Sequence, residues 1–508
     1  MSTGRSASSP VSLVIPPSPF LADERVFPFI GVLKVASVLE AAGVPVDILD
    51  CSGYANYQDL LLEYLDQHRD MDWFGITATT PQLPNAVELL HTIREQRPQA
   101  RVTVGGPHAT LTTAAWKMDQ EKGLRGRGSI AYDQLTSLFD CVVAGDGEEA
   151  VFRALGVNQP QLIDADDLHS DLFLKRGSLE DFPYPARQLI DLASYHYTID
   201  GHPATSLIGQ LGCPFKCGFC GGRDAASFRF IRTRRPEHIA QEIRHLHSVY
   251  GYTGYMFYDD ELNVTPRGLE DLCGALIALQ DELGTEMRFR GFVKAELFTE
   301  RQAAAMYKAG FRVLLSGVES GSDRILAAME KRTTAEINSR CLRLARDAGM
   351  EFKALMSIGH PGESRRTVVE SVEWVLREQP NEVDWTVITQ YPGSPYFDHS
   401  VRVSGQRGTW VYETMAGELL YSREVDYTRE AEFYKGVSGS YVSYVWTPDL
   451  SADTLVWERD EAERVTRAAL GMPPIQSIAA EQFEHSMGQG LLPARVLRST
   501  RETMAVSH

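Results

Sequence analysis

The sequence lacks the features of a membrane, secreted or nucleic-acid-binding protein. Its longest apolar runs, such as residues 11–15 and 313–315, fall far short of the roughly 18 residues that span a bilayer. The first nine residues are polar and small, without the apolar core of a signal peptide, so we expect residues 1–10 to form a disordered lead. A net charge of −18 argues against nucleic acid as the main partner, because phosphate binding needs a basic surface.

Cysteine is also scarce. The 508 residues include seven cysteines, an odd number that fits a reducing cytoplasm better than a disulfide framework. Three of them, Cys213, Cys217 and Cys220, form a C-x3-C-x2-C array. The other four stand singly in strand or helix patterns, and we expect them to be buried and inert; they are Cys51, Cys141, Cys273 and Cys341.

The cysteine array is the main functional signal in the chain. Closely spaced thiolates hold iron–sulfur clusters, because one short loop must wrap one cluster. Three ligands for four irons leave one iron open, and an open position distinguishes catalytic from structural metal sites by the logic of zinc. Glycines 212, 218, 221 and 222 allow the backbone to curl around such a group. A zinc knuckle or unrelated buried thiols are the alternatives, but the next zinc-type ligand, His238, falls in a predicted helix.

The array resembles the signature of the radical S-adenosylmethionine (SAM) superfamily, with Phe219 as the aromatic residue before the last cysteine. The resemblance implies a [4Fe–4S] cluster on the three cysteines, with SAM chelating the open iron. Reduction by a donor such as flavodoxin or ferredoxin would cleave SAM to a 5′-deoxyadenosyl radical. Phe219, Gly221 and Gly222 are then expected to contact this cofactor.

Residues 11–156 alternate short apolar strands with helical patterns, which predicts a Rossmann-like, doubly wound parallel sheet. In such sheets ligands bind outside the carboxyl ends of the strands. Turns rich in Gly, Pro and Thr stand at those ends, although Gly and Pro punctuate such loops in any protein. These turns contain Pro16, Thr79, Thr80, Gly105, Gly106, Gly145, Gly147 and Glu148.

The order of these turns resembles the cobalamin-binding domain that precedes many radical SAM cores. The resemblance implies that the eight turn residues contact cobalamin. The D-x-H-x-x-G motif of methionine synthase and the mutases is absent, which is usual in the radical SAM branch, where cobalamin has no histidine ligand from the protein. We expect His108 to be a turn residue and not a cobalt ligand. Whether the domain binds cobalamin or serves as a scaffold stays open.

A proline-broken linker is predicted at residues 157–200, followed at 201–398 by six strand–helix units that indicate a partial (β/α)6 barrel. Barrel sites lie at the carboxyl ends of the strands. There Asp260 and Glu319 would accept hydrogen bonds from the ammonium or ribose of SAM, and Arg290 would pair with its carboxylate. Phe219 and the turn at Ser357–Pro361 would enclose the adenine. Any one of these carboxylates alone is more typical of a helix cap or solvated turn.

Residues 399–508 are rich in aromatics and predict a mostly helical cap, in which tyrosines pack the core more often than they relay radicals. No cysteine follows Cys341, which excludes auxiliary clusters held by C-terminal cysteines. A basic cluster at Arg229, Arg232, Arg234 and Arg235 indicates a solvated face rather than an anion site.

Together these patterns predict a cytoplasmic radical SAM enzyme that functionalises an unactivated carbon of a small molecule. Cobalamin-dependent C-methylation in secondary metabolism is the favoured reaction. Radical dehydration, epimerisation or cyclisation, with the cobalamin domain vestigial, is the alternative. A non-catalytic cobalamin or iron–sulfur sensor is a third class, and such a sensor would need no SAM pocket.

Overall fold

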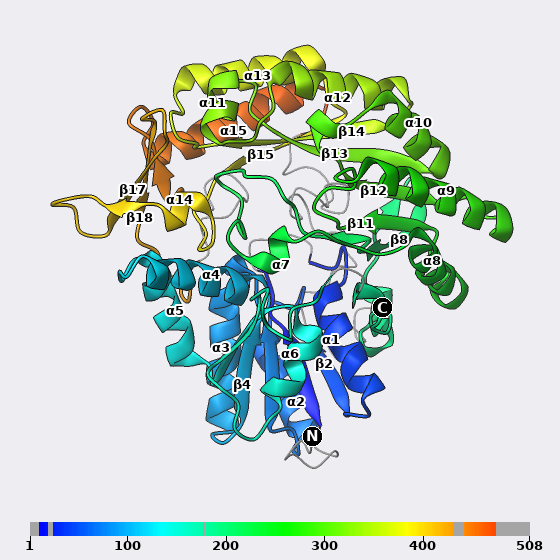
Figure 1. Ribbon diagram of the computed structural model, residues 1–508, viewed down its shortest axis with the longest axis vertical. Helices are drawn as coiled ribbons and strands as arrows, with labels where there is room; N and C mark the ends of the chain where they lie inside the picture. Colours follow the sequence, from blue (N-terminus) through cyan, green and yellow to red (C-terminus); the bar gives the residue numbers. More distant parts are fainter. Residues whose placement is uncertain (1–9, 19–23, 176–177, 431–440, 474–508) are drawn as a thin grey trace.

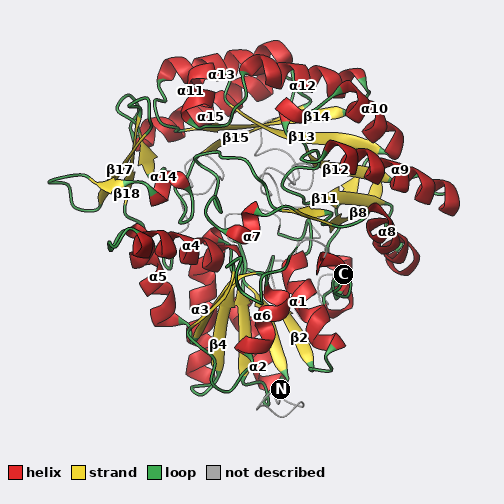
Figure 2. Ribbon diagram, in the orientation of Figure 1, coloured by secondary structure: helices red, strands yellow, loops and turns green. Residues whose placement is uncertain are grey.

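The computed structural model describes residues 10–18, 24–175, 178–430 and 441–473 (Figure 1). Residues 1–9 of the predicted lead, and residues 431–440 and 474–508 of the predicted cap, lie outside this description. Two parallel sheets dominate the described chain, one in each half of the molecule (Figure 2). None of the described helices is long and apolar enough to cross a membrane.

The N-terminal sheet has six parallel strands among the described residues, in the order β2-β1-β3-β4-β5-β6. Helices cover both of its faces, and the central strands are therefore apolar on both sides. One face packs on α1 (Ile30–Ala41) and α6 (Gly147–Ala154). The other packs on α2 (Tyr57–Gln67), α3 (Leu83–Gln96), α4 (Pro107–Glu121) and α5 (Arg127–Leu138). The strands are β1 (Val11–Ile15), β2 (Val46–Asp50), β3 (Trp73–Thr77), β4 (Arg101–Gly105), β5 (Cys141–Gly145) and β6 (Leu162–Ala165).

This architecture confirms the predicted doubly wound sheet. The sixth strand was not predicted, because the four-residue β6, Leu-Ile-Asp-Ala, falls inside the predicted linker and is too short to form a clear apolar run.

The second sheet is the partial barrel, in the order β15-β14-β13-β12-β11-β8-β7. Its first six strands are parallel, and the short β7 (Thr198–Ile199) pairs antiparallel at the edge. The helices that follow the strands form an outer arc (Figure 1). The six strand–helix units confirm the predicted partial barrel. The parallel strands are β8 (His202–Leu207), β11 (Gly254–Phe257), β12 (Arg288–Phe292), β13 (Phe311–Glu319), β14 (Glu351–Ile358) and β15 (Glu382–Val387), and the outer helices include α8 (Pro236–Tyr250), α9 (Pro266–Leu283), α10 (Glu300–Ala309), α12 (Ala335–Asp347) and α13 (Arg365–Glu378).

The described part of the cap contains one long helix, α15 (Ala452–Ala469), which packs against β15 and α13. It also contains an antiparallel sheet that the sequence did not predict: β16 (Val401–Arg402), β17 (Thr409–Glu413), β18 (Leu419–Arg423) and β19 (Val445–Trp446). In β17 the buried Trp410 and Tyr412 alternate with more exposed residues, which is the period of a strand. The strands are too short for that period to stand out among so many aromatics.

Candidate active site

The cysteine loop leaves β9 (Gln210–Leu211) and returns through the short helix α7 (Ala226–Arg229) and β10 (Arg232–Thr233). The Cys213 N–H donates to the carbonyl of Phe228 at 2.9 Å. The Arg229 guanidinium donates to the carbonyls of Pro214, at 2.9 Å, and Phe215. Gly212 has φ +89°, and a Cβ there would lie 2.3 Å from the Phe230 oxygen, so only glycine fits. The start of the loop is thus closed by its own return segment.

The far side of the loop is held by more distant parts of the barrel. The Gly218 N–H donates to Met329 O at 2.8 Å, and the Tyr396 N–H donates to Gly218 O at 3.0 Å. A Cβ on Gly218 would lie 2.6 Å from the Tyr396 ring. The Gly222 N–H donates to Gly393 O at 3.0 Å. These contacts fix the backbone on both sides of Cys217 and Cys220.

The three cysteines of the array lie within this one loop. Within the described part of the chain, no three Cys, His, Asp or Glu side chains are grouped as a metal site. Burial raises the pKa of the Cys213 thiol to about 11, and binding to iron would have to displace that proton. Cys213, Cys217 and Cys220 are therefore the residues that would hold a [4Fe–4S] cluster.

The carboxyl ends of β13 and β14 bring two of the predicted SAM contacts together. Glu319 accepts a hydrogen bond from Ser357 Oγ at 2.7 Å and pairs with Lys331 at 3.2 Å. Ser357 Oγ also lies 2.8 Å from His360 Nε2, and the His360 ring meets the ring of Phe219 edge to face at 5.3 Å. Phe219, Glu319 and Ser357 thus form one group beside the cysteine loop.

Two members of this group were not singled out as site residues: His360 falls inside the predicted Ser357–Pro361 turn, and Lys331 lies outside every predicted motif. His360 is completely buried, and burial lowers its pKa to about 4, so it is neutral. It stands in the sequence Gly359-His-Pro-Gly, in which the glycines and the proline indicate a turn and give no sign of a role for the histidine. Burial alone would lower the pKa of Lys331, but the charges of Glu319, Cys217 and Glu261 raise it above its usual value. No motif marks Lys331.

The three acidic residues after β11, Asp259, Asp260 and Glu261, differ in their hydrogen bonds. Asp259 is buried and accepts from the Gly209 N–H at 2.7 Å, and Asp260 accepts from the Gly212 N–H at 3.0 Å. Glu261 differs, because its buried Oε2 has no hydrogen-bond partner in the described structure. Burial raises the pKa of Glu261 to about 7. Of the three, Glu261 has the orphaned oxygen that the ammonium or ribose of SAM would satisfy, while Asp260 fixes the loop.

Arg290 lies elsewhere in the barrel. It is buried on β12 and donates to the hydroxyl of Tyr197 at 2.7 Å. The geometry therefore groups Arg290 with Tyr197 and not with Glu319 and Ser357. Its pairing with the SAM carboxylate stays a prediction.

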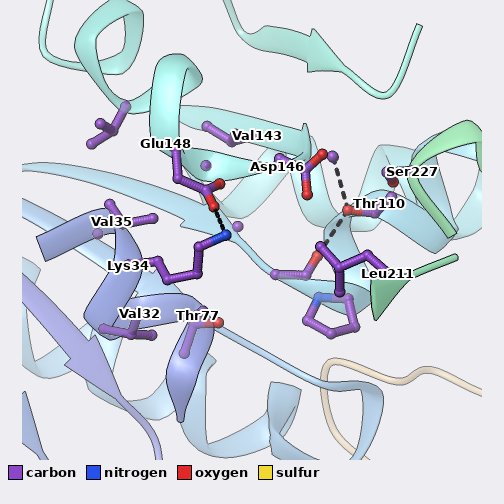
Figure 3. A pocket seen from close by; sticks show the side chains of 18 of the residues that line it. Val32, Lys34, Val35, Thr77, Thr110, Val143, Asp146, Glu148, Leu211 and Ser227 are labelled. Atoms are coloured by element: carbon purple, nitrogen blue, oxygen red, sulfur yellow. Dashed lines mark hydrogen bonds and ion pairs between the residues drawn. The ribbon is translucent and has the colours of Figure 1, made fainter. Parts of the chain in front are cut away.

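A cavity of about 410 Å³ separates the two sheets (Figure 3). The carboxyl ends of β3, β4 and β5 line it from one side, and the segment from Leu211 to Gly212, with Tyr258 and Asp260, lines it from the other. Lys34 of α1 pairs with Glu148 inside it, and Thr110 Oγ1 accepts from the Gly145 N–H at 2.9 Å. Five predicted turn residues line this cavity: Gly105, Gly106, Gly145, Gly147 and Glu148.

The other three predicted turn residues, Pro16, Thr79 and Thr80, are not among the residues that line the cavity. Gln82 joins two of them, because its Nε2 donates to Pro16 O at 2.8 Å and its Oε1 accepts from Thr79 Oγ1 at 2.9 Å. Thr80 contacts His108. These residues shape the turns and are not among the cavity's lining residues.

The cavity has an apolar wall and glycine turns at which a corrinoid could approach the backbone. It extends between α1, α6 and the sheet to Trp73, along an apolar wall that includes Val32 and Val143. Glycines keep this space open: a Cβ at Gly147 would lie 2.7 Å from Val35, and Gly106, with φ +92°, could not carry a side chain without strain. The residues present therefore fit cobalamin, with backbone approach at the glycine turns and the Lys34–Glu148 pair as a polar contact.

His108 is a buried residue in the first turn of helix α4, whereas the sequence predicted a residue of the turn before it. Its Nδ1 lies 3.0 Å from Thr80 Oγ1 and its Nε2 lies 3.2 Å from Thr112 Oγ1, so both ring nitrogens are engaged. Burial lowers its pKa to about 3. A cobalt ligand would need one free nitrogen.

We therefore expect His108→Gln to bind cobalamin with an unchanged visible spectrum, at a stability cost of about 1–3 kcal/mol from disturbed buried hydrogen bonds. Electron paramagnetic resonance of the Co(II) form should show no nitrogen coupling that the substitution removes. A lost coupling would identify His108 as a ligand after all.

The basic cluster is neither an anion site nor a uniformly solvated face, since each arginine has its own protein partner. Arg229 closes the cysteine loop, as described above. The buried Arg232 pairs with Asp146, and Arg234 pairs with Glu242 at 2.7 Å. Arg235 alone is well exposed, and it pairs with Glu180 at 2.6 Å.

Comparison with known families finds two domains in the chain. Residues 207–375 match the radical SAM superfamily, and residues 24–135 match the B12 binding domain. An uncharacterised methyltransferase, PH0819, of Pyrococcus horikoshii is 24% identical over 335 residues, which cover 65% of this chain and 70% of the relative. The anaerobic magnesium-protoporphyrin IX monomethyl ester cyclase of Cereibacter sphaeroides is 25% identical over 365 residues, which cover 68% of this chain but only 57% of the cyclase.

Solved structures share the fold. The radical SAM methyltransferase TsrM of Kitasatospora setae, with cobalamin and a [4Fe–4S] cluster bound, superposes with a TM-score of 0.59 at 17% identity, covering 96% of this chain and 91% of TsrM. The cobalamin-dependent SAM radical enzyme OxsB, with aqua-cobalamin and SAM bound, superposes with a TM-score of 0.52 at 17% identity. The match covers 75% of this chain and 54% of OxsB. At these identities the likeness is one of fold.

Proposed function

Because the chain belongs to the radical SAM enzymes that carry a B12-binding domain, we propose that it transfers a methyl group to a carbon atom of a small molecule. Its cofactors are a [4Fe–4S] cluster, SAM and cobalamin. The observation that carries the proposal is the cavity between the sheets, which the corrinoid-type turns line on one side and the flank of the cysteine loop lines on the other. Methyl transfer to a substrate radical needs this proximity.

When bound, the cluster and SAM supply a 5′-deoxyadenosyl radical on reduction, and cobalamin supplies the methyl group. The protein's own part is to hold and separate these groups. Asp260 and Arg229 shape the cysteine loop, while Glu261 and Glu319 offer carboxylate oxygens to the polar groups of SAM. Leu211, Phe228 and Tyr258 give the shared cavity an apolar wall, which helps to exclude water from a radical site.

The names of the relatives favour methylation without deciding it. PH0819 is called a methyltransferase and TsrM is one, and the fit of cobalamin to the cavity adds a methyl carrier. Two matching cyclases favour radical ring formation as the second candidate, in which cobalamin donates no methyl. In either case a low-potential donor of the cytoplasm, such as flavodoxin or ferredoxin, would supply the electron.

The test uses the full chain, expressed with cobalamin uptake and iron–sulfur supply and purified without oxygen. We expect stoichiometric corrinoid beside four irons, and the formation of both 5′-deoxyadenosine and S-adenosylhomocysteine from SAM. A cluster without corrinoid, even after methylcobalamin is added, would overturn methyl transfer and favour the second candidate. A protein that makes no 5′-deoxyadenosine after reduction would not be a radical enzyme.

A further inference from the structure

Backbone strain gathers at one place beside the cysteine loop. Among the described residues, five other than glycine have a positive φ, and three of these surround Lys331. They are Glu319 at +64°, Glu330 at +57° and Arg332 at +60°. Such conformations cost free energy in residues that carry a Cβ, and they persist where the surrounding structure imposes them, often at functional sites.

The strained turn delivers a buried cation to the loop. The Lys331 side chain is only 9% exposed, and its Nζ lies 3.2 Å from Glu319 Oε1 and 5.9 Å from the centroid of the Phe219 ring. The residue two positions earlier, Met329, accepts the hydrogen bond of the Gly218 N–H at 2.8 Å. The turn therefore contacts the cysteine loop twice: Met329 O binds the Gly218 N–H, and the Lys331 ammonium lies near the Phe219 ring.

Packing alone does not explain a lysine at this position. A buried ion pair is commonly replaced by apolar residues of similar volume without loss of stability. Glu319 has a donor for Oε2 in Ser357 Oγ at 2.7 Å, and Lys331 Nζ donates to the other oxygen, Oε1, at 3.2 Å. What only a cation supplies here is a fixed positive charge beside the ligands of the cluster.

We propose that Lys331 is a positioning residue that raises the reduction potential of the [4Fe–4S] cluster, so that its one-electron reduction becomes easier. The inference rests on the proposed function only in requiring the cluster. Cluster potentials depend on net charge, hydrogen bonds and solvent exposure. One electron from a low-potential donor adds one negative charge to the cluster, and a buried cation nearby stabilises that charge. Glu319 acts in the opposite sense.

The sign of each effect gives the test. Reconstituted full-length proteins are titrated with dithionite and redox mediators, without SAM or cobalamin, and the reduced cluster is followed by electron paramagnetic resonance. We expect Lys331→Met to lower the ratio of reduced to oxidised cluster about tenfold to a hundredfold at a given potential, a shift of about 60–120 mV for a one-electron couple. Glu319→Gln should shift the cluster potential upward. Lys331→Arg keeps the positive charge and should have the potential of the unaltered protein.

A matched control is Lys353→Met. Lys353 is also buried and pairs with Glu382 at 3.1 Å, but it lies four residues before Ser357 on β14, roughly 13 Å from it. Its replacement should leave the potential unchanged. An unchanged potential in Lys331→Met with four irons bound, or shifts of the same sign in Lys331→Met and Glu319→Gln, would overturn the proposal.

The proposal can still be tested if Lys331→Met fails to bind the cluster or if the protein proves not to transfer methyl groups. If Lys331→Met takes up no cluster, the potentials of Glu319→Gln and Lys331→Arg decide the question, and a potential in Glu319→Gln that does not rise rejects the proposal. Because cobalamin is left out, failure of methyl transfer leaves this result standing.

Discussion

Gly31→Phe should abolish cobalamin binding while the cluster and the reductive cleavage of SAM survive. Gly31 stands in the first turn of α1 and lines the cavity between the sheets. A Cβ there would meet no atom within 4 Å, so a larger side chain enters open space without displacing the fold. A phenyl ring there would take up part of the cavity of about 410 Å³ that the corrinoid needs. We expect the affinity for cobalamin to fall by at least about a hundredfold, some 3 kcal/mol.

Gly274→Phe is the matched control, because Gly274 is also an exposed helical glycine whose Cβ would meet nothing within 4 Å. It lies on α9, outside the cavity lining. Corrinoid content and equilibrium titration with hydroxocobalamin measure the effect, and 5′-deoxyadenosine formation reports the radical SAM half. If Gly31→Phe bound cobalamin as tightly as Gly274→Phe, the corrinoid would lie elsewhere.

The parts of the fold that could be predicted are those that depend on patterns among neighbouring residues. Strand–helix alternation gives both parallel sheets, because each apolar run is bounded by its own turn. Cys213, Cys217 and Cys220 lie within one loop, so their spacing alone indicates a common ligand. The turns at Gly105 and Gly145 reach one cavity because parallel strands end at the same edge of a sheet.

Contacts between distant segments could not be predicted. Arg127 on α5 is buried against the segment that follows β15, where it donates to Gln390 Oε1 at 2.7 Å and lies 4.1 Å from the Phe397 ring centroid. Phe27, from the segment between β1 and α1, packs against Tyr197 and Tyr258 beside the barrel strands. The partners of Arg127 and Phe27 follow more than 160 residues later, and no local pattern encodes such a pairing.

The same limit explains why Arg232 was interpreted as part of a basic surface. Its side chain is 1% exposed and pairs with Asp146, whose side chain is 13% exposed and lies in the turn that lines the cavity. It also donates to Ser227 O at 2.7 Å. The carboxylate of Asp166, which directly follows β6, accepts a hydrogen bond from the N–H of the same Ser227 at 2.7 Å. Two carboxylates of the N-terminal half thus meet at the return segment of the cysteine loop.

Arg232→Met should therefore weaken both cofactor sites at once. Removing one partner of a buried ion pair leaves the other charge uncompensated and costs about 3–5 kcal/mol. Here that charge is Asp146, which faces the cofactor cavity beside Glu148. We expect a lower melting temperature, together with reduced corrinoid content and reduced iron content in the same preparation. Differential scanning fluorimetry and metal analysis measure all three.

Arg235→Met separates this bridge from a general loss of basic charge. Arg235 belongs to the same sequence cluster, but its side chain is 73% exposed and its ion pair with Glu180 is at the surface. Exposed pairs contribute little to stability, so this variant should resemble the unaltered protein. If Arg232→Met lost corrinoid but kept its full iron, the turn at Asp146 would be independent of the cysteine loop. Joint loss would mean that the cavity and the loop are built as one unit, as the proposed methyl transfer requires.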